Sequence, residues 1–329
     1  MTEPVLCLSR EDMETMLDFD SVLPIIEDGF SQQAAGRVVT FPAVRVGLQE
    51  FDSVFGIKSG FVNKTSTLGL KAGGYWGKRV AAGKPGHFST IVLFDPSDGR
   101  PLAIMDGNYI TELRTAAAGA IAAKHLSRSD VDGLAVGLIG SGVQGRSQIK
   151  GLLRVLKVAR VQVFDIDRKA SETVAGDLRK EGVSALSVAT PQEAVANADV
   201  ILTTTPSKKA IVLDDWITPG MHINAMGADT RGKQELDTNI LCRATVVVDD
   251  RRQAGELGEW QHMVAAGLAD KHPIYAELGE ITAGIKPGRT DNREITVFDG
   301  TGVSFQDLAT ARYAMDLARA RNMGQIVNL

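Results

Sequence analysis

The sequence has few cysteines, few aromatic residues and no long apolar run. Cys7 and Cys242 are its two cysteines, too few for a disulfide framework or a cysteine-based metal cluster. No stretch approaches the ~18–20 apolar residues of a membrane-spanning helix. Met1–Glu14 holds four acidic residues and no uninterrupted apolar segment, which argues against a signal peptide. We therefore expect a cytoplasmic protein without a membrane partner, and both thiols free and buried.

The chain also lacks an excess of charge of one sign. Lys plus Arg number 36 and Asp plus Glu 40, a formal net charge of −4, which favours neither nucleic acid nor an anionic membrane as partner. Small anionic substrates remain possible because a few local Arg and Lys side chains bind them. The five histidines lack the spacing of metal ligands, so we expect no metal site. His222 lies in an apparent strand and is expected to be a hydrogen-bonded core residue.

The first third of the chain combines helices with short strands. Residues 9–35 are expected to form one helix, which Ser9 caps and Gly36 ends. Short apolar runs broken by Gly, Pro and Asp follow over residues 41–104 and predict antiparallel strands and hairpins. An alanine-rich helix is predicted over 111–126.

The pattern changes near residue 133. Leu134–Ile139 is continuously apolar, as in a strand buried on both faces. Predicted helices and strands then alternate to about residue 248, which indicates βαβ units and a parallel sheet. A last helix is expected over 304–323. We predict an α/β protein with a Rossmann-type doubly wound domain, a first domain of residues 1–118 with 304–329, and a second of 119–303.

A glycine-rich loop follows the first buried strand of the second domain. Its sequence is Gly140-Ser141-Gly142-Val143-Gln144-Gly145, which fits the dinucleotide-binding pattern G-x-G-x-x-G between a strand and a helix. The first glycine permits a tight turn, the second lets the backbone approach a pyrophosphate, and the third permits close packing of helix and strand. An ordinary glycine-rich turn is the alternative. The context favours a bound nicotinamide dinucleotide.

Asp165 ends the next predicted strand, 25 residues after Gly140. A carboxylate there accepts hydrogen bonds from the ribose hydroxyls and repels a 2′-phosphate, so Asp165 favours NAD over NADP. A helix N-cap is an alternative role, since Asp165 and Asp167 both precede a helix. Arg168 could pair with a phosphate, which keeps NADP as a second possibility.

Three cations and one acid are candidates for contact with the substrate. Arg45 and Lys71 lie in predicted strands, and Arg114 lies near the start of the alanine-rich helix. Arginine is well suited to clamp a carboxylate, although a surface ion pair is the ordinary role of such a residue. Asp229 follows the strand over 222–226, at the edge where parallel sheets bind ligands, although it could also be a turn residue.

Several long segments together resemble the ornithine cyclodeaminase/μ-crystallin family over essentially the whole chain. They are KAGGYWGKR, HFSTIVLFDPSDGRPLAIMDG, TELRTAAAGAIAAKHLSR, GLIGSGVQG, NAMGADTRGKQEL, GEITAGIKPGRTDNREITVFDGTG and ARNMG. The resemblance implies an N-terminal α/β domain for substrate binding and dimerisation, completed by the C-terminal helix, plus an NAD-binding Rossmann domain. It also implies a homodimer.

The resemblance also implies roles for single residues. Arg45, Lys71 and Arg114 would hold the substrate α-carboxylate, and Lys71 would lie close to the reacting carbon and nitrogen. We expect the two arginines to lower the pKa of Lys71 by repulsion between like charges. Asp229 would be the general acid or base. The residues implied to contact the cofactor are Thr115 at a phosphate, and Thr204, Met226, Thr301 and Gly302 around the adenine and nicotinamide.

One segment departs from the cyclodeaminase pattern. Cyclodeaminases of this family place a Glu on the strand after Arg45 to hold the distal amine of the substrate, and here Gly56 lies near that position. Lys58 lies two residues further, on the same face of a strand. A cationic amine would meet no carboxylate there. Lys58 could instead bind a second acidic group, as in iminosuccinate, although a solvated lysine is the simpler interpretation.

The leading hypothesis is an NAD(H)-dependent oxidoreductase that interconverts an α-imino or oxo acid and an L-α-amino acid. It would be an imine or ketimine reductase, or an amino-acid dehydrogenase, with a dicarboxylic substrate as one candidate. One alternative is a cyclodeaminase, a lyase that uses NAD catalytically. The other is a μ-crystallin-like protein that binds the cofactor with little turnover.

Overall fold

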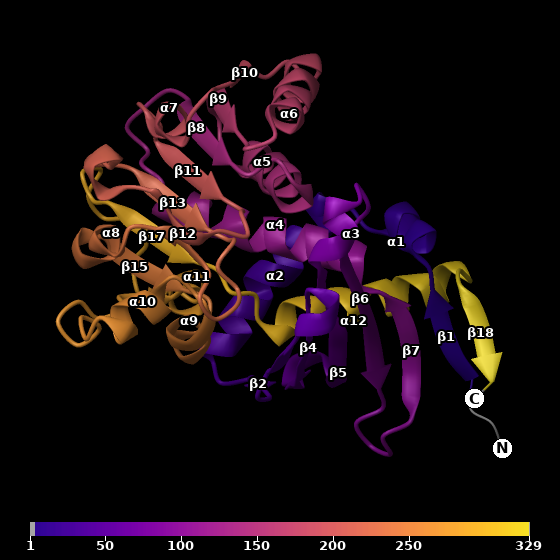
Figure 1. Cartoon of the computed structure of the whole chain (residues 1–329). Helices are drawn as coiled ribbons and strands as arrows, with labels where there is room; N and C mark the ends of the chain where they lie inside the picture. The colour runs from indigo at the N-terminus through magenta and orange to yellow at the C-terminus, as the bar shows by residue number, and fades with distance from the viewer. Residues whose placement is uncertain (1–3, 329) are drawn as a thin grey trace. The chain divides into compact units, whose positions relative to one another are not determined.

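The computed structural model describes residues 4–328, which form two compact units (Figure 1). Unit 1 comprises Met1–Arg114 and Val303–Leu329, and unit 2 comprises Thr115–Gly302. The boundaries predicted from the sequence, after residues 118 and 303, lie four residues and one residue further along the chain. Unit 1 is thus assembled from both ends of the chain, whereas unit 2 is continuous.

Unit 1 contains an eight-stranded sheet in the order β18-β1-β7-β6-β5-β4-β2, with β3 also paired to β4. Every pair is antiparallel except β1 with β7, so the predicted antiparallel strands are confirmed. The strands at the two chain ends, β1 and β18, were not predicted. The strands are β1 (Pro4–Leu8), β2 (Val38–Thr40), β3 (Val44–Leu48), β4 (Ser53–Val62), β5 (Thr67–Trp76), β6 (His87–Phe94), β7 (Pro101–Asp106) and β18 (Gln325–Asn328).

The predicted single helix over residues 9–35 is wrong, because two helices occupy this segment. Helix α1 (Arg10–Met16) ends at Leu17, whose backbone is extended, and α2 (Phe19–Ala34) begins directly afterwards. Asp18 caps α2 by accepting a hydrogen bond from the Ser21 amide at 2.8 Å. A capping carboxylate stabilises the start of a new helix. The hydrophobic periodicity continues across residues 17 and 18, so it did not indicate the break between the two helices. The short helix α3 (Gly77–Ala81) follows β5.

The last helix, α12 (Ser304–Arg321), covers one face of the unit 1 sheet (Figure 1). A Cβ atom at Gly60 would lie 2.8 Å from Ser304 Oγ, and one at Gly69 would lie 2.9 Å from Leu308 Cδ2. Glycines in β4 and β5 therefore let the helix approach the strands closely. Phe305 packs edge-on against Phe30 of α2, with ring centroids 5.1 Å apart. We call this covered face the inner sheet face.

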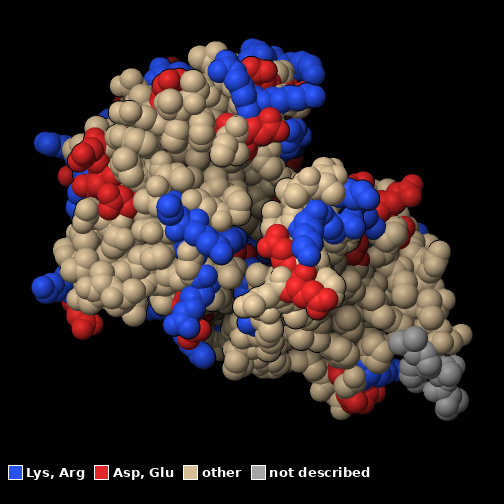
Figure 2. All heavy atoms as spheres, viewed as in Figure 1, with Lys and Arg blue, Asp and Glu red and all other residues tan. Residues whose placement is uncertain are grey.

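The opposite face of the same sheet, the outer sheet face, is apolar and exposed. Val46, Phe55 and Phe88 lie in register across β3, β4 and β6, and they are 52%, 37% and 43% exposed. Val44 and Leu48 extend this surface along β3. Figure 2 shows mainly uncharged side chains over β7. A sheet face of this kind is typical of a protein–protein contact.

Unit 2 is a doubly wound parallel sheet in the order β10-β9-β8-β11-β13-β17-β15-β16, and this confirms the predicted fold class. The strand order reverses between β8 and β11, which is where open α/β sheets bind ligands. The strands are β8 (Leu134–Ile139), β9 (Val158–Phe164), β10 (Ala185–Ser187), β11 (Val200–Thr203), β13 (His222–Ala225), β15 (Thr245–Val248), β16 (Ala276–Glu277) and β17 (Thr296–Asp299), and β12 (Lys208–Val212) pairs with β14 (Gln234–Leu236) separately.

Helices connect these strands, as the alternating pattern predicted. Helix α4 (Gly107–Leu126) begins four residues earlier than the predicted 111–126. The others are α5 (Val143–Val155), α6 (Arg168–Lys180), α7 (Pro191–Val195), α8 (Thr238–Arg243), α9 (Arg251–Leu257), α10 (Trp260–Ala265) and α11 (Leu278–Thr282).

The structure tests the predictions made from the sequence for His222, Cys7 and Cys242. His222 is fully buried and hydrogen-bonded to Thr296 Oγ1 and Asn224 Oδ1, both at 2.9 Å, so the core assignment is confirmed. Burial lowers its pKa to about 3. Cys7 and Cys242 are free as predicted, but they are half-buried rather than buried. Within residues 4–328, no helix combines the length and apolarity needed to cross a bilayer.

Candidate active site

The glycine-rich loop of unit 2 has the geometry that each of its glycines predicts. Gly140 has a φ of +104°, which L side chains rarely adopt. A Cβ at Gly145 would lie 1.9 Å from the carbonyl oxygen of Gly140, so a larger residue would push α5 away from β8. A Cβ at Gly142 would meet nothing within 4 Å. The loop is therefore tight at its first and third glycines and open at its second, where a ligand can approach the backbone.

The N-terminus of α5 fits an anionic group. Gly142 is its N-cap residue and provides no side-chain hydrogen bond to the amides of the first turn, which includes Val143 and Gln144. The buried side-chain oxygens Gln144 Oε1 and Thr115 Oγ1 also have no hydrogen-bond partner. Free helix amides and the Thr115 hydroxyl can donate to the phosphate oxygens of a dinucleotide, whereas Gln144 Oε1 can only accept, as from a ribose hydroxyl.

Asp165 directly follows β9 and contacts the glycine-rich loop. Its Oδ2 accepts a hydrogen bond from the Ser141 amide at 2.6 Å, and its Oδ1 accepts one from the Asp167 amide at 2.9 Å. The N-cap of α6 is Asp167, so the alternative that Asp165 caps the helix is wrong. Arg168 is largely exposed and pairs with Glu172 at 2.9 Å.

The remaining cofactor candidates of unit 2 lie after the carboxyl ends of parallel strands. Thr204 follows β11 and donates a hydrogen bond to the Gly140 carbonyl oxygen at 3.1 Å, and Met226 follows β13 and is buried. Thr301 and Gly302 follow β17, and both donate to the Asp249 carboxylate, at 2.7 and 2.5 Å. The structure thus gathers these residues on one edge of the sheet.

Asp229 lies on the same edge, in the loop after β13. Its Oδ1 accepts hydrogen bonds from Lys233 Nζ at 2.7 Å and from Thr230 Oγ1 at 3.1 Å. The side chain is 34% exposed, which leaves it accessible to a ligand. A partly exposed carboxylate is one of the side chains that serve as general acids or bases in enzymes.

In unit 1, Lys71 and Arg114 converge on one carboxylate. Asp307 Oδ1 accepts hydrogen bonds from Lys71 Nζ at 2.8 Å and from Arg114 Nε at 3.1 Å. Lys71 also donates to Thr111 Oγ1 at 3.1 Å, and Arg114 donates to Gln306 Oε1 at 2.8 Å. Lys71, Arg114 and Asp307 are 8%, 6% and 1% exposed. Such a buried group of two cations and one acid is well suited to bind a further small anion.

The pKa of Lys71 is lowered to about 8, in the predicted direction but mainly for another reason. Burial is the largest cause, and the charges of Arg114 and Arg45 add to it. Asp307 opposes them by stabilising the cationic form. The prediction rested on the arginines alone and overlooked both burial and the buried acid.

Strand register puts the two other predicted cations on the inner sheet face with Lys71. Lys58 of β4 lies directly opposite Lys71 of β5, and Gly56 lies opposite Arg45 of β3. Directly opposed residues project to the same side of a sheet. Lys58 also acts electrostatically on Asp307, lowering its pKa together with Arg114 and Lys71 against the effect of burial.

Asp307 and Gln306 are the principal residues that sequence reasoning missed. They occupy the first turn of α12, more than 190 residues from Arg114 in the sequence. Their one sequence feature is that they are two adjacent polar residues near the start of a predicted helix, which has many ordinary explanations. Only the return of α12 to unit 1 gives them a role.

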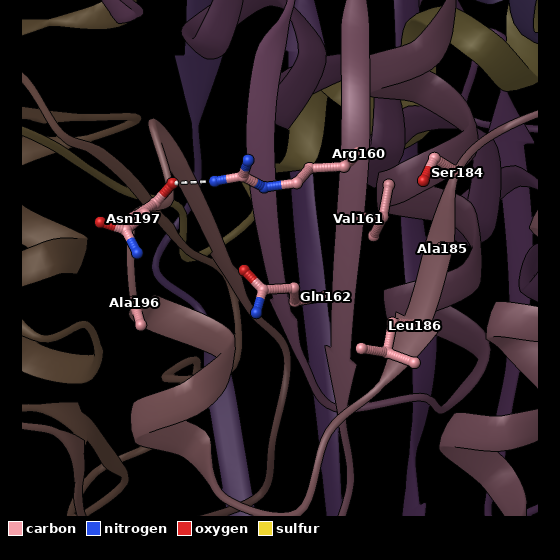
Figure 3. Close-up of a pocket in the computed structure, with 8 residues that line it drawn as sticks. All are labelled: Arg160, Val161, Gln162, Ser184, Ala185, Leu186, Ala196 and Asn197. Atoms are coloured by element: carbon pink, nitrogen blue, oxygen red, sulfur yellow. Dashed lines mark hydrogen bonds between the residues drawn. The ribbon is translucent and has the colours of Figure 1, made fainter.

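A surface hollow elsewhere in unit 2 does not have the chemistry of an active site. Figure 3 shows Arg160 reaching across it to the backbone of Asn197, where Nη2 donates to the carbonyl oxygen at 3.0 Å. It contains none of the candidate site residues and no acid. Its lining is Arg160, Val161, Gln162, Ser184, Ala185, Leu186, Ala196 and Asn197. The described residues also contain no His, Cys, Asp and Glu group that could hold a metal ion.

A parallel doubly wound sheet with this glycine-rich loop defines unit 2 as a Rossmann-type fold. Residues 4–322 match the model of the ornithine cyclodeaminase/mu-crystallin family. The chain belongs to this family, as its sequence segments predicted.

Three similar proteins illustrate the family. Iminosuccinate reductase of Paracoccus denitrificans is 36% identical over 331 residues, which cover 99% of this chain and 100% of the relative. An archaeal alanine dehydrogenase, solved as a dimer with bound NAD, has a TM-score of 0.93 and 35% identity, covering 99% and 100% of the two chains. The Δ1-pyrroline-2-carboxylate reductase of Thermococcus litoralis, solved with NADH and L-proline, has a TM-score of 0.94 and 30% identity, covering 98% and 100%.

Proposed function

We propose that this protein is an NAD(H)-dependent oxidoreductase that interconverts an α-imino or α-oxo acid and an L-α-amino acid. The buried group formed by Lys71, Arg114 and Asp307 carries the proposal, because it offers a carboxylate clamp next to a titratable amine. The family relatives with reductase and dehydrogenase activity support it.

The cofactor is assigned to residues of unit 2. Gly140, Gly142, Val143, Gln144 and Gly145 would hold the dinucleotide pyrophosphate at the start of α5. Asp165 would accept hydrogen bonds from the ribose diol, which favours NAD over NADP. The other proposed cofactor contacts are Thr115, Arg168, Thr204, Met226, Thr301 and Gly302.

The substrate is assigned to the cations of unit 1. Arg114 and Arg45 would bind the α-carboxylate, and Lys71 would exchange a proton with the substrate nitrogen or oxygen. When bound, NADH supplies the hydride that the imine carbon accepts. Asp229 would be the general acid or base that exchanges a proton with the amine or a water molecule when the imine forms or is hydrolysed. Reduction then adds one hydride at carbon and one proton at nitrogen.

A substrate screen tests the proposed reaction. Purified protein would be offered NADH or NADPH with α-keto acids, alone and with ammonia or primary amines, and L-ornithine with NAD. Loss of NADH absorbance with a keto acid and an amine is the expected result. Proline formed from L-ornithine without net NADH change would instead identify a cyclodeaminase. NADH binding without any turnover would identify a μ-crystallin-like binding protein.

Two substitutions test the catalytic roles. Lys71→Ala and Asp229→Ala should each lower kcat by about 10²–10⁴-fold, the usual cost of losing a proton-transfer group. NADH affinity should stay nearly unchanged, because neither residue belongs to the glycine-rich loop. Arg114→Ala should mainly raise KM. Near-normal kcat in either alanine variant would refute the role of that residue.

We further propose that the substrate is a dicarboxylic imine such as iminosuccinate. Lys58 lies opposite Lys71 on the inner sheet face, so a second cationic side chain adjoins the group that would hold the α-carboxylate. Its electrostatic effect on Asp307 supports this placement. A charge-assisted contact contributes about 1.5–3 kcal/mol, enough to select a second carboxylate over a methyl group.

The Lys58→Met variant tests the dicarboxylic substrate. The ratio of kcat/KM for dicarboxylic and monocarboxylic imines should fall about tenfold or more, as expected for a contact of this strength. Lys64→Met is the matched control, because Lys64 pairs with Asp28 on the surface at 2.9 Å. An unchanged ratio in Lys58→Met would remove Lys58 from substrate recognition, whereas the reductase activity itself would stand.

We propose that the protein is a homodimer, and that the outer sheet face of unit 1 is the contact. The exposed row of Val46, Phe55 and Phe88 provides a flat apolar surface. The archaeal alanine dehydrogenase supports a second copy of the chain as the partner, because it was solved as a dimer.

A further inference from the structure

Glu235 is a fully buried carboxylate that the proposed reaction does not use. It lies in the middle of β14 and accepts three hydrogen bonds. The donors are Thr203 Oγ1 at 2.7 Å, the Thr205 amide at 2.5 Å and the Gly227 amide at 2.8 Å. One side chain therefore connects two separate loops.

These loops follow neighbouring parallel strands at the ligand-binding edge of the unit 2 sheet. Thr205 lies just after β11 and Gly227 just after β13, and these strands are paired in register. Thr204 and Met226 adjoin the two bonded amides, and Asp229 lies two residues after Gly227. The Glu235 carboxylate thus binds the backbone beside two residues assigned to the reaction and two positions before a third.

The contact of Glu235 with the second loop requires glycine. A Cβ atom at Gly227 would lie 2.5 Å from Glu235 Oε1, closer than real Cβ contacts allow. Glu235 is itself held in place, because Glu259 accepts hydrogen bonds from the Glu235 amide at 2.7 Å and the Leu236 amide at 3.2 Å. Glu259 is also buried. The carboxylate is therefore supported on its own strand and pressed against the loop.

We propose that Glu235 is a positioning residue that holds the loops after β11 and β13 in the conformation that receives the nicotinamide end of the dinucleotide. This inference rests on the proposed function, since it assumes that unit 2 binds NAD(H). A carboxylate suits the task because both oxygens accept and neither donates, so it satisfies three donors from two loops. The adenosine end, which is assigned to the glycine-rich loop and Asp165, does not depend on it.

Binding of NADH and of ADP-ribose to Glu235→Gln tests this role. Glutamine keeps the shape of the side chain but replaces one acceptor oxygen with an NH2 group. This group would face the Thr205 amide or the Gly227 amide, which also donate, so a hydrogen bond would be lost. The Kd of NADH, measured by fluorescence titration, should rise about tenfold or more, the effect expected for a buried donor left unsatisfied. ADP-ribose lacks the nicotinamide, so its Kd, measured by calorimetry, should change by less than about twofold.

Asp199→Asn is the matched control. Asp199 Oδ2 likewise accepts a backbone amide, that of Ala135 at 2.8 Å, but it precedes β11 at the opposite edge of the sheet. Both variants should lower the Tm, whereas only Glu235→Gln should change the ratio of the two Kd values. Should Glu235→Gln fail to fold, Thr203→Val removes one of the three hydrogen bonds and should raise the Kd of NADH about threefold.

Two results would overturn the inference. One is wild-type NADH affinity in a folded Glu235→Gln or, if that variant does not fold, in Thr203→Val. The other is equal weakening of NADH and ADP-ribose, which would indicate general destabilisation of unit 2. Failure of the wild-type protein to bind either ligand would instead refute the proposed function, and with it the premise of the inference.

Discussion

Lys71 is buried beside one acidic side chain, that of Asp307, and this environment should determine how activity depends on pH. Its pKa of about 8 means that the cationic form, which binds anions and donates a proton, is lost as the pH rises through that value. We predict that kcat/KM for imine reduction falls above pH 8, because this ratio reports the pKa values of the free enzyme. In Lys71→Arg this decline should be absent, since arginine stays charged.

Asp307 provides the internal check on this assignment. Its charge raises the pKa of Lys71, so Asp307→Asn should move the decline of kcat/KM to lower pH. A purely structural role for Asp307 would lower activity at every pH without moving the midpoint. An unmoved midpoint would therefore show that the decline belongs to another group.

Asp165 makes a second prediction at the scale of single residues. We expect wild-type protein to prefer NADH over NADPH, and Asp165→Ser to weaken NADH and improve NADPH. Asp165 also accepts a hydrogen bond from the Ser141 amide at 2.6 Å, so loosening of the loop should make the loss for NADH larger than the gain for NADPH. Competing titrations with the two cofactors measure the ratio. Equal use of both by the wild type would refute the assignment.

Single residues were predictable from the sequence where a local motif carried them. The glycine-rich motif itself predicts the roles of Gly140, Gly142 and Gly145. Each of these positions in the strand–loop–helix turn needs a residue without a side chain. Lys71 and Arg114 were candidates by residue type, but their roles could be inferred only through the family resemblance. Asp307 could not be found, since the contact that gives it meaning joins segments at opposite ends of the chain.

At the scale of elements, the carboxyl ends of the unit 2 strands are tied together by buried acids. Asp299, which ends β17, accepts the Trp260 amide at the start of α10 at 2.9 Å, and its Oδ1 has no hydrogen-bond partner. Burial raises its pKa from 3.8 to about 7, with the charges of Asp249 and Glu235 adding to the effect. This junction of strand and helix is therefore sensitive to pH.

The sign of that sensitivity follows from proton linkage. Between about pH 4 and 7 the folded protein keeps the Asp299 proton while the unfolded chain has lost it, so the free energy of unfolding falls as the pH rises. We predict that Asp299→Asn flattens this fall and is more stable than the wild type above pH 7, by on the order of 1–3 kcal/mol. Urea denaturation across this pH range measures the slope.

Asp215→Asn is the matched control, because it removes the same charge from an exposed position of unit 2. An Asp299→Asn variant with the wild-type slope would show that Asp299 is ionised in both states.

A helix or strand could be predicted from the sequence when the residues that determine it lie close together in the chain. The buried strands and following helices of unit 2 were expected because their apolar runs and turns repeat along the sequence. The break between α1 and α2 depends on one capping side chain, Asp18, inside an uninterrupted hydrophobic pattern. Strands β1 and β18 are short, and they pair with each other from the two ends of the chain. No turn sequence between neighbouring strands therefore indicates them.

At the scale of the whole molecule, the outer sheet face predicts the oligomeric state. Phe55→Glu or Val46→Glu should convert the proposed dimer to a monomer, because a charge in the middle of an apolar contact is costly to bury. Light scattering after size-exclusion chromatography measures the mass. Ile285→Glu is the control, since Ile285 is an exposed apolar residue of unit 2. A dimer that persists in both sheet variants would assign the contact to another surface.

The division of unit 1 between the two chain ends has a consequence for the order of synthesis. Unit 2 is complete when the ribosome has added Gly302, but α12, which begins at Ser304, is still to be made. Until then Lys71 and Arg114 have no Asp307 to hold them, and the inner sheet face has no helix over it. A prematurely terminated product would thus retain the dinucleotide-type fold without the assembled anion clamp. The clamp can therefore form only in molecules that include the first turn of α12, where Asp307 lies.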